Sequence, residues 1–341
     1  MPALVDDEKF MRAALREAKK GLGKTSPNPA VGAVLVSGGQ IISKAFHAHA
    51  GAAHAEAHCL SKIARIPSGT TLYVTLEPCS TTGQTPPCTS AILATGVSRV
   101  VVGAIDPNPA HRGRGIKVLE DAGVDVDSGV LTAECTALNR SFNKWIQTGR
   151  PYVIAKCGMS LDGRLTAAPN ESRWITSAAA REHANVRRAF VDAILVGAET
   201  VRRDNPRLTI RTVAGARQPW RVVLSRSGYL SRQAHLFTDA HADRTLVFTD
   251  HSLDSVLTEL GKREITSVLI EGGGTVLSQA LDGRLIDAVE IYLGSVFTGG
   301  PVLAFGSLGA ANTAEALRLS DVSYERIGDD VYLQAQASNA E

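Results

Sequence analysis

One histidine, one glutamate and two cysteines occur in an order that suits a metal-bound water. His54 and Glu56 are separated by a single alanine, and two Pro-Cys pairs end at Cys79 and Cys88. Zinc accepts neutral imidazole and thiolate ligands, and a site with three protein ligands keeps one position for water. A nearby carboxylate that does not bind the metal can move protons. The pattern predicts zinc-dependent hydrolytic deamination with Glu56 as the proton carrier, against the alternative of a core histidine beside two buried thiols.

The elements around these residues should form an alternating α/β domain. A first helix, capped by Asp6 or Asp7, has an apolar face and should end near Gly21. We expect strands over 30–36, 40–46, 70–77 and 99–106, and helices over 54–64, 89–95 and 115–122. Strands that alternate with helices predict a layered domain. The zinc candidates then fall where strands end and helices begin, and a helix N-terminus stabilises a thiolate.

A helical connector over 131–150 leads to a second alternating series. We therefore expect two domains, a zinc-dependent deaminase over residues 1–147 and a second α/β domain over residues 148–341. The second series comprises a helix near 177–190 and further segments at 152–156, 193–201, 220–225, 245–249, 267–271, 288–297 and 331–335.

A glycine-rich turn in the second domain could receive a phosphate. Glu271 and three glycines follow an apolar strand and precede a helix expected over 276–281. Glycines let the backbone approach a phosphate, and a helix N-terminus attracts its charge. The turn lacks the glycine spacing of a Rossmann site, and by itself it could be no more than a turn.

Length and composition narrow the class of protein. The chain has 341 residues, 44% of them hydrophobic and 5% aromatic, with a formal net charge of +2. This length suits two domains, and the weak charge disfavours a nucleic-acid partner. Five sparse cysteines indicate a reduced, cytoplasmic location. No apolar run reaches the roughly 18 residues of a membrane span, and the first residues do not resemble a signal peptide. We expect a small-molecule substrate, no nucleic-acid or membrane partner, and a homo-oligomer, either a dimer or a tetramer.

Short motifs run in order along nearly the whole chain. They lie at 27–32, 54–56, 75–88, 106–109, 113–115, 160–163, 172–176, 204–206 and 271–274. Together they resemble the bifunctional riboflavin-biosynthesis proteins. The resemblance implies a cytidine-deaminase-like three-layer domain followed by a dihydrofolate-reductase-like domain. It also implies two reactions: zinc-dependent deamination of 2,5-diamino-6-ribosylamino-4(3H)-pyrimidinone 5′-phosphate, and reduction of its ribosyl group to ribityl by NADPH.

The same resemblance implies residues for each site. In the deaminase, the pyrimidine and ribose phosphate would be held by Asn28, His47 and Asn108. In the reductase, NADPH would be lined by Gly158, Trp174, Thr200, Asp204, Gly273, Gly274, Thr275, Val276, Leu277, Ser278 and Gln279. The ribose-phosphate substrate would be lined by Ser172, Arg188, Leu208, Arg211 and Glu271.

Several of these residues have more than one interpretation. Lys156 lies near a strand end and could contact or polarise the substrate. Trp174 could stack on nicotinamide or belong to the core, and Arg188 and Arg211 could be solvated charges. Arg226 follows a strand where it could bind the 2′-phosphate that distinguishes NADPH from NADH.

Two positions depart from the family pattern. Thr81 stands where the family usually has histidine, and Gln84 where it has lysine or arginine. A basic residue there would make a charge-assisted contact to the substrate phosphate. Either Arg112, Arg114 or another chain supplies that charge, or the substrate or activity is altered. The alternatives are therefore a paralogue acting on a related modified pyrimidine, or a protein with one inactive half. A nucleic-acid base deaminase and a regulatory pyrimidine-binding protein are disfavoured by the charge and by the intact zinc pattern.

Overall fold

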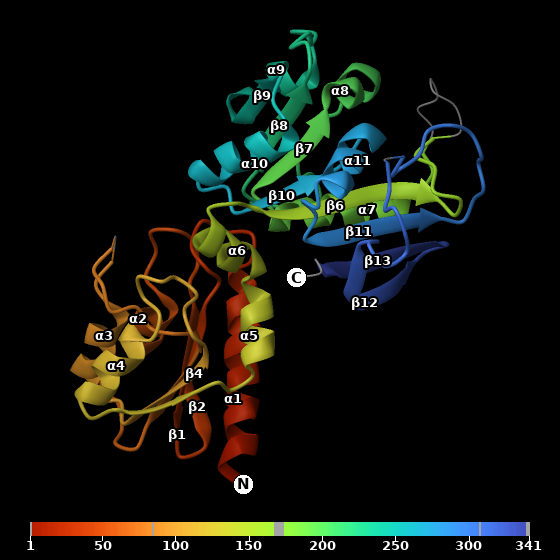
Figure 1. Cartoon of the computed structure of the whole chain (residues 1–341). Helices are drawn as coiled ribbons and strands as arrows, with labels where there is room; N and C mark the ends of the chain where they lie inside the picture. The colour runs from red at the N-terminus through yellow and green to blue at the C-terminus, as the bar shows by residue number, and fades with distance from the viewer. Residues whose placement is uncertain (1, 84, 167–173, 307, 339–341) are drawn as a thin grey trace. The chain divides into compact units, whose positions relative to one another are not determined.

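The computed structural model describes residues 2–83, 85–166, 174–306 and 308–338, with the side chains of residues 2–5 left out. The chain divides into two compact units, Met1–Gly149 and Arg150–Glu341, each built on its own sheet (Figure 1). Among the helices of these described residues, none combines the length and hydrophobicity needed to cross a bilayer.

The first unit contains a mixed five-stranded sheet. Its strands are β1 (Gly32–Ser37), β2 (Gln40–Phe46), β3 (Thr71–Leu76), β4 (Arg99–Ala104) and β5 (Asp125–Ser128). They lie in the order β2-β1-β3-β4-β5, with β3, β4 and β5 parallel and β1 antiparallel to β2 and β3. Because β3 and β4 are parallel, the turns that follow them leave the sheet at the same edge.

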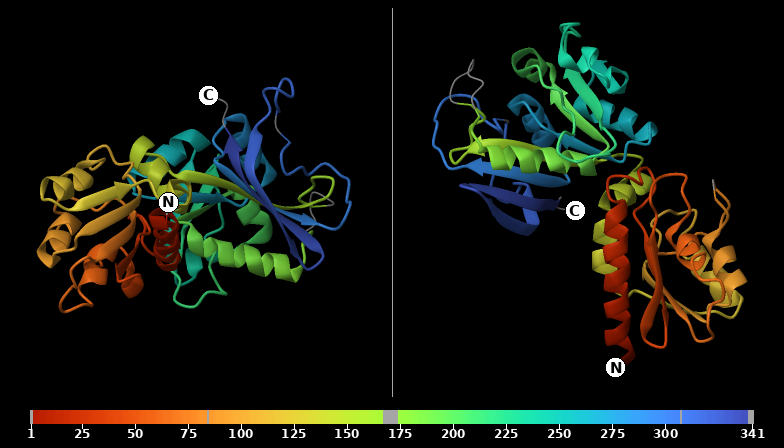
Figure 2. Two further views of the ribbon diagram at one scale, coloured as in Figure 1. Left: turned by 90° about the horizontal axis from the view of Figure 1, so that it is seen from below. Right: turned by 180° about the vertical axis from the view of Figure 1, so that it is seen from behind.

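Helices cover both faces of this sheet, as expected for a three-layer domain (Figure 2). One face carries α1 (Pro2–Ala18) and α5 (Thr132–Leu138), and the other carries α2 (Ala55–Leu60), α3 (Cys88–Thr95) and α4 (Arg114–Asp121); α6 (Arg140–Thr148) follows α5. Along β4, Val100 and Val102 pack into the core under α2, while Val101 packs into the core under α1. Alternation places apolar residues on both faces because both are buried.

The second unit contains an eight-stranded sheet. Its strands are β6 (Tyr152–Ser160), β7 (Ala193–Gly197), β8 (Trp220–Ser225), β9 (Thr245–Thr249), β10 (Ser267–Ile270), β11 (Ala288–Gly294), β12 (Arg318–Ile327) and β13 (Asp330–Ser338). The order is β12-β13-β11-β6-β10-β7-β8-β9, and all neighbours from β11 to β9 are parallel. The helices are α7 (Ala178–Arg187), α8 (Ala198–Asp204), α9 (His235–Thr238), α10 (Leu253–Lys262) and α11 (Gly274–Asp282). The loops after β7, β8 and β10 therefore share one edge, where the sequence places most of the expected reductase residues.

Several expected boundaries are wrong. Helix α1 begins at Pro2, so neither Asp6 nor Asp7 caps it, and Asp7 instead is buried and accepts a hydrogen bond from the Tyr73 hydroxyl at 2.7 Å. Helix α2 stops at Leu60 rather than at residue 64, and the segment expected over 193–201 changes from strand to helix after Gly197. Strands β5 and β12 were not predicted, because neither shows the apolar alternation of a half-buried strand.

Candidate active sites

Three predicted metal ligands come together in the first unit. The imidazole nitrogen and the two sulfurs of His54, Cys79 and Cys88 all lie within 4.8 Å of one another. His54 Nδ1 is 3.2 Å from Cys88 Sγ and 3.5 Å from Cys79 Sγ. One imidazole and two thiols match the donor preference of zinc, and three ligands leave a position for water. The structure therefore brings together a donor set that fits zinc.

Local structure explains why these three side chains converge. Cys79 follows β3 at the carboxyl edge of the sheet, while His54 is the N-cap of α2 and Cys88 is the first residue of α3. The backbone N–H of Cys88 points at Cys79 Sγ at 3.4 Å. Backbone N–H groups at helix starts favour negative charge, so this arrangement suits thiolate ligands.

The ionisation of the two thiols is shared between them. A hydrogen bond from Cys88, together with one from His54, lowers the pKa of Cys79 to about 4. The hydrogen bond to Cys79, with burial, raises the pKa of Cys88. Two adjacent thiolates repel each other unless a cation lies between them. With both thiols ionised, the pair therefore favours a bound cation.

Glu56, in the first turn of α2, lies buried beside the triad of His54, Cys79 and Cys88. Its side chain interacts with His54 and Cys88, and burial raises the pKa of Glu56 to about 7. A carboxyl group that gains and loses a proton near neutral pH is suited to general acid–base chemistry. The position agrees with the proton carrier expected from the sequence.

A residue that the sequence analysis missed supports His54. The Thr85 hydroxyl lies 3.3 Å from His54 Nε2, the nitrogen that faces away from the thiols. A partner at the far nitrogen fixes the tautomer and the orientation of a metal-binding imidazole. Thr85 lies in the insert between the two cysteines, and only its place near the ligands could have indicated this contact.

Two of the expected substrate contacts lie together next to the triad. Asn28 Nδ2 is 3.2 Å from His47 Nε2, and the His47 ring lies 5.3 Å from the His54 ring. Asn108 belongs to the loop after β4, where its backbone N–H donates to Asp106 Oδ1 at 2.8 Å.

Glu77 fastens that loop to the end of β3. This buried carboxylate accepts hydrogen bonds from the backbone N–H groups of Asp106, Gly113 and Gly115 at 3.2, 2.9 and 2.9 Å. Close packing accompanies these bonds, because a Cβ atom on Gly115 would lie 1.9 Å from the carbonyl oxygen of Pro78. The loop that carries Asn108 is therefore held against the turn that carries Cys79.

The structure adds a candidate for the missing phosphate contact. His111 Nδ1 lies 3.4 Å from the Thr81 hydroxyl, so an imidazole comes from the neighbouring loop to the position of the expected family histidine. Arg112 follows it on the same loop, Arg114 is the first residue of α4, and both are exposed. Gln84 lies outside the described residues.

In the second unit, Glu271 joins two cations at the carboxyl edge of the sheet. Its carboxylate forms a paired contact with Arg188, at 2.7 Å to Nε and 2.8 Å to Nη2, and lies 3.9 Å from Lys156 Nζ. Burial alone would raise the pKa of Glu271. The charges of Arg188, Lys156 and Arg211 outweigh this effect and lower the pKa of Glu271 to about 2. Arg188 is therefore largely buried in an ion pair, and the alternative of a solvated charge is wrong.

The cluster retains positive charge after this pairing. Burial and the nearby charges of Arg188 and Arg207 lower the pKa of Arg211, against the opposing effect of Glu271. Within the described part of the chain, the guanidinium of Arg211 has no ion pair. Arg188, Arg211 and Lys156 act on the Glu271 carboxylate, and Arg207 lies near Arg211, so the cluster provides a suitable place for a phosphate. Arg207 was not predicted, since a lone arginine in a loop carries no motif.

The glycine turn leads directly into α11, with Gly273 as its N-cap. A Cβ atom on Gly274 would lie 2.2 Å from the carbonyl oxygen of Leu303, so only glycine fits there. Val276 and Leu277 pack into the core, and the Ser278 hydroxyl accepts a hydrogen bond from the Gly306 N–H. Thr275 and Gln279 are exposed. The expected cofactor contacts of the buried residues could thus come only from the backbone.

The remaining reductase candidates are spread along the same unit. Gly158 faces Thr176, Gly273 faces Thr200, and Asp204 is exposed at the end of α8. Trp174 is 74% exposed with Arg181 over its ring, so it is not a core residue. Arg226 is exposed after β8, and Ser172 lies outside the described residues.

Comparison with known proteins covers both units. The family model described as the cytidine and deoxycytidylate deaminase zinc-binding region matches residues 4–104, and the RibD C-terminal domain matches residues 151–333. The riboflavin biosynthesis protein RibD of Escherichia coli K12 is 37% identical over 96% of this chain and 99% of its own. The RibD protein of Aquifex aeolicus is 35% identical over 96% and 97%.

Solved structures agree with this match along the full chain. RibD from Acinetobacter baumannii superposes with a TM-score of 0.92 at 35% identity, over 98% of this chain and 100% of that chain. A diaminohydroxyphosphoribosylaminopyrimidine deaminase/5-amino-6-(5-phosphoribosylamino)uracil reductase from Thermotoga maritima gives 0.88 at 34% identity, with the same coverage. The expected cytidine-deaminase-like and dihydrofolate-reductase-like folds are confirmed. The chain belongs to the RibD family of bifunctional deaminase–reductases of riboflavin biosynthesis.

Proposed function

We propose that residues 1–147 deaminate 2,5-diamino-6-ribosylamino-4(3H)-pyrimidinone 5′-phosphate with zinc held by His54, Cys79 and Cys88. The convergence of these three ligands beside buried Glu56 is the observation that carries the proposal. Zinc, when bound, supplies a water of lowered pKa and polarises the reacting centre. Glu56 takes one proton from the attacking water and gives it to the ring nitrogen; it then takes the second proton from the same oxygen and gives it to the departing amine, which leaves as ammonia.

The pyrimidine is held by residues on either side of the triad. Asn28 and His47 bind its polar edge, and Asn108 binds from the loop that Glu77 fastens. Arg112 and Arg114 provide positive charge for the 5′-phosphate, and His111 provides an imidazole N–H, in place of the absent basic residues at positions 81 and 84. A paralogue that acts on a related modified pyrimidine remains the second candidate, because Thr81 itself brings no charge.

Residues 148–341 then reduce the ribosyl group with NADPH. NADPH, when bound, supplies the hydride for the open form of the sugar. Arg188 and Arg211 hold the substrate phosphate, while Glu271 and Lys156 orient and polarise the sugar. The N-terminus of α11 receives a cofactor phosphate through its backbone, and Arg226 binds the 2′-phosphate. The working protein is a homo-oligomer.

Two assays on one preparation test both halves. Zinc content per chain is measured first, and ammonia release from the diaminopyrimidinone substrate is then followed without NADPH. Addition of NADPH should start its oxidation. The Glu56→Gln variant should retain zinc, and its rate of ammonia release should fall by a factor of about 10²–10⁴. It should still oxidise NADPH when it is given the deaminated product. Bound zinc with no ammonia release by the wild-type protein would support the paralogue.

A further inference from the structure

A fully buried arginine lies beneath the loop that carries two of the expected substrate contacts. Arg221, near the start of β8, is 1% exposed and ranks among the largest buried side chains of the described residues. Its neighbour Val222 faces the core that contains α10, whereas Arg221 itself lies on the face that carries α9. Burial of a guanidinium is costly unless it is paired and hydrogen-bonded. The position therefore needs a structural reason.

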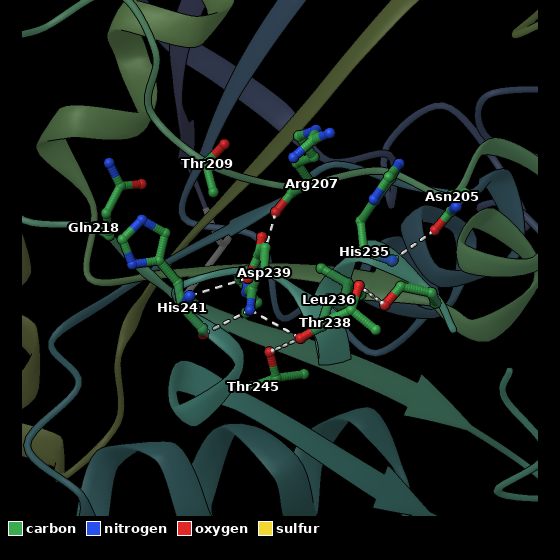
Figure 3. A network of polar contacts seen from close by, with 12 residues as sticks. Asn205, Arg207, Thr209, Gln218, His235, Leu236, Thr238, Asp239, His241 and Thr245 are labelled. Atoms are coloured by element: carbon green, nitrogen blue, oxygen red, sulfur yellow. Dashed lines mark hydrogen bonds and ion pairs between the residues drawn. The ribbon is translucent and has the colours of Figure 1, made fainter. Parts of the chain in front are cut away.

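Arg221 binds three separate segments of backbone. Its Nη2 donates to the carbonyl oxygens of Leu236 and His241 at 2.8 and 2.6 Å, and its Nη1 donates to that of Arg207 at 3.2 Å. The charge is balanced by Asp239, whose carboxylate accepts from Nη1 at 2.7 Å. Figure 3 shows Arg207, Leu236, Asp239 and His241 gathered around this network of polar contacts.

Among the described strands, none pairs with the loop after α8. Asn205 and Leu208 have φ angles of 42° and 51°, which non-glycine residues rarely adopt. Side chains supply the bonds that a sheet would otherwise give. Gln218 accepts from the Ile210 N–H at 2.8 Å. Asn185 accepts from the Arg211 N–H at 2.8 Å.

We propose that Arg221 and Asp239 are positioning residues that set the conformation of loop 205–211 and thereby place Arg211 for the substrate phosphate. Arg221 donates a hydrogen bond to the Arg207 carbonyl oxygen. The next residue, Leu208, packs into the core on the same face of the sheet as Arg221. Arg211, four residues after Arg207, lies close to Arg188 and Glu271. The inference rests on the proposed contact of Arg211 with substrate.

Arg221→Lys tests the proposal, because one ammonium group keeps the charge but cannot reach all four acceptors. We expect the substrate KM of NADPH oxidation to rise roughly ten- to a hundredfold with kcat less affected. Ammonia release by the first unit should be unchanged, which provides an internal control. Backbone amides of residues 210–212 should exchange with deuterium faster than in the wild-type protein.

Two further variants separate positioning from stability. Val256→Ala removes buried methyl groups from the opposite face of the sheet and should lower Tm without changing KM. Asp239→Asn should resemble Arg221→Lys. A folded Arg221→Lys protein with wild-type KM and wild-type exchange at 210–212 overturns the inference. If the wild-type protein does not oxidise NADPH with the deaminated substrate, the proposed function fails, and the exchange measurement still decides whether Arg221 orders the loop.

Discussion

Arg188 and Glu271 meet in a paired, largely buried contact that links α7 and the residues after it to the end of β10. The two bonds measure 2.7 and 2.8 Å, and Lys156 approaches the same carboxylate from β6. The contact serves the fold and the site together, because it fixes one cation while leaving Arg211 without an ion pair in the described chain.

Glu271→Gln should destabilise the second unit in a pH-dependent way. Removal of one partner of a buried pair costs about 3–5 kcal/mol at neutral pH. The folded-state pKa of Glu271, about 2, lies below its ordinary value of 4.5. The stabilisation is therefore complete above pH 4.5 and is lost as the pH falls toward 2. Chemical denaturation at pH 7 and pH 3 should show a smaller difference between wild type and variant at pH 3. An equal difference at both values would contradict the assignment.

Gly115→Ala should disturb the first unit and spare the second. The added Cβ would meet the Pro78 carbonyl oxygen at 1.9 Å, so backbone must shift at the turn that leads to Cys79. We expect a loss of about 1–3 kcal/mol and weaker zinc retention, measured by denaturation and by metal content after dialysis. Gly83→Ala is the matched control, since its Cβ would meet nothing within 4 Å. Similar zinc loss in both variants would argue against the packing explanation.

His111→Ala should weaken recognition of the phosphate in the deaminase. Loss of a charge-assisted contact predicts a KM for the phosphorylated substrate that is higher by roughly tenfold. The KM for the same compound without its phosphate should not change. Gln84→Lys should have the opposite effect and lower the KM for the phosphorylated substrate. Equal effects of His111→Ala on both substrates would place the phosphate elsewhere.

Arg226→Ala should reduce the preference for NADPH over NADH. We expect roughly tenfold weaker NADPH binding and unchanged NADH binding, measured by fluorescence titration. Arg202→Ala is a suitable control, because this arginine is also exposed but is paired with Glu199 at 3.0 Å. A parallel loss for both cofactors would show that Arg226 does not contact the 2′-phosphate.

The residues of the deaminase triad could be predicted from sequence because their spacing is local and their chemistry is narrow. The bounds of β8 and β9 were also predicted correctly, at 220–225 and 245–249. Glu77, Thr85 and Arg221 were missed for a physical reason: their partners are backbone groups or side chains from distant segments, which leave no periodic or spaced pattern. The exposed strand β12 was missed because burial, which produces alternation, is absent along it.

The insert between Cys79 and Cys88 is anchored near both of its ends, and residues 81–83 within it are exposed. Cys79 and Cys88 fix its flanks, Thr85 contacts His54, and a Cβ atom on Gly83 would meet no atom within 4 Å outside its chain neighbours. Randomised libraries confined to residues 81–84 should thus yield many proteins that still load metal. Such libraries offer a practical route to deaminases with new substrate ranges on an unchanged scaffold.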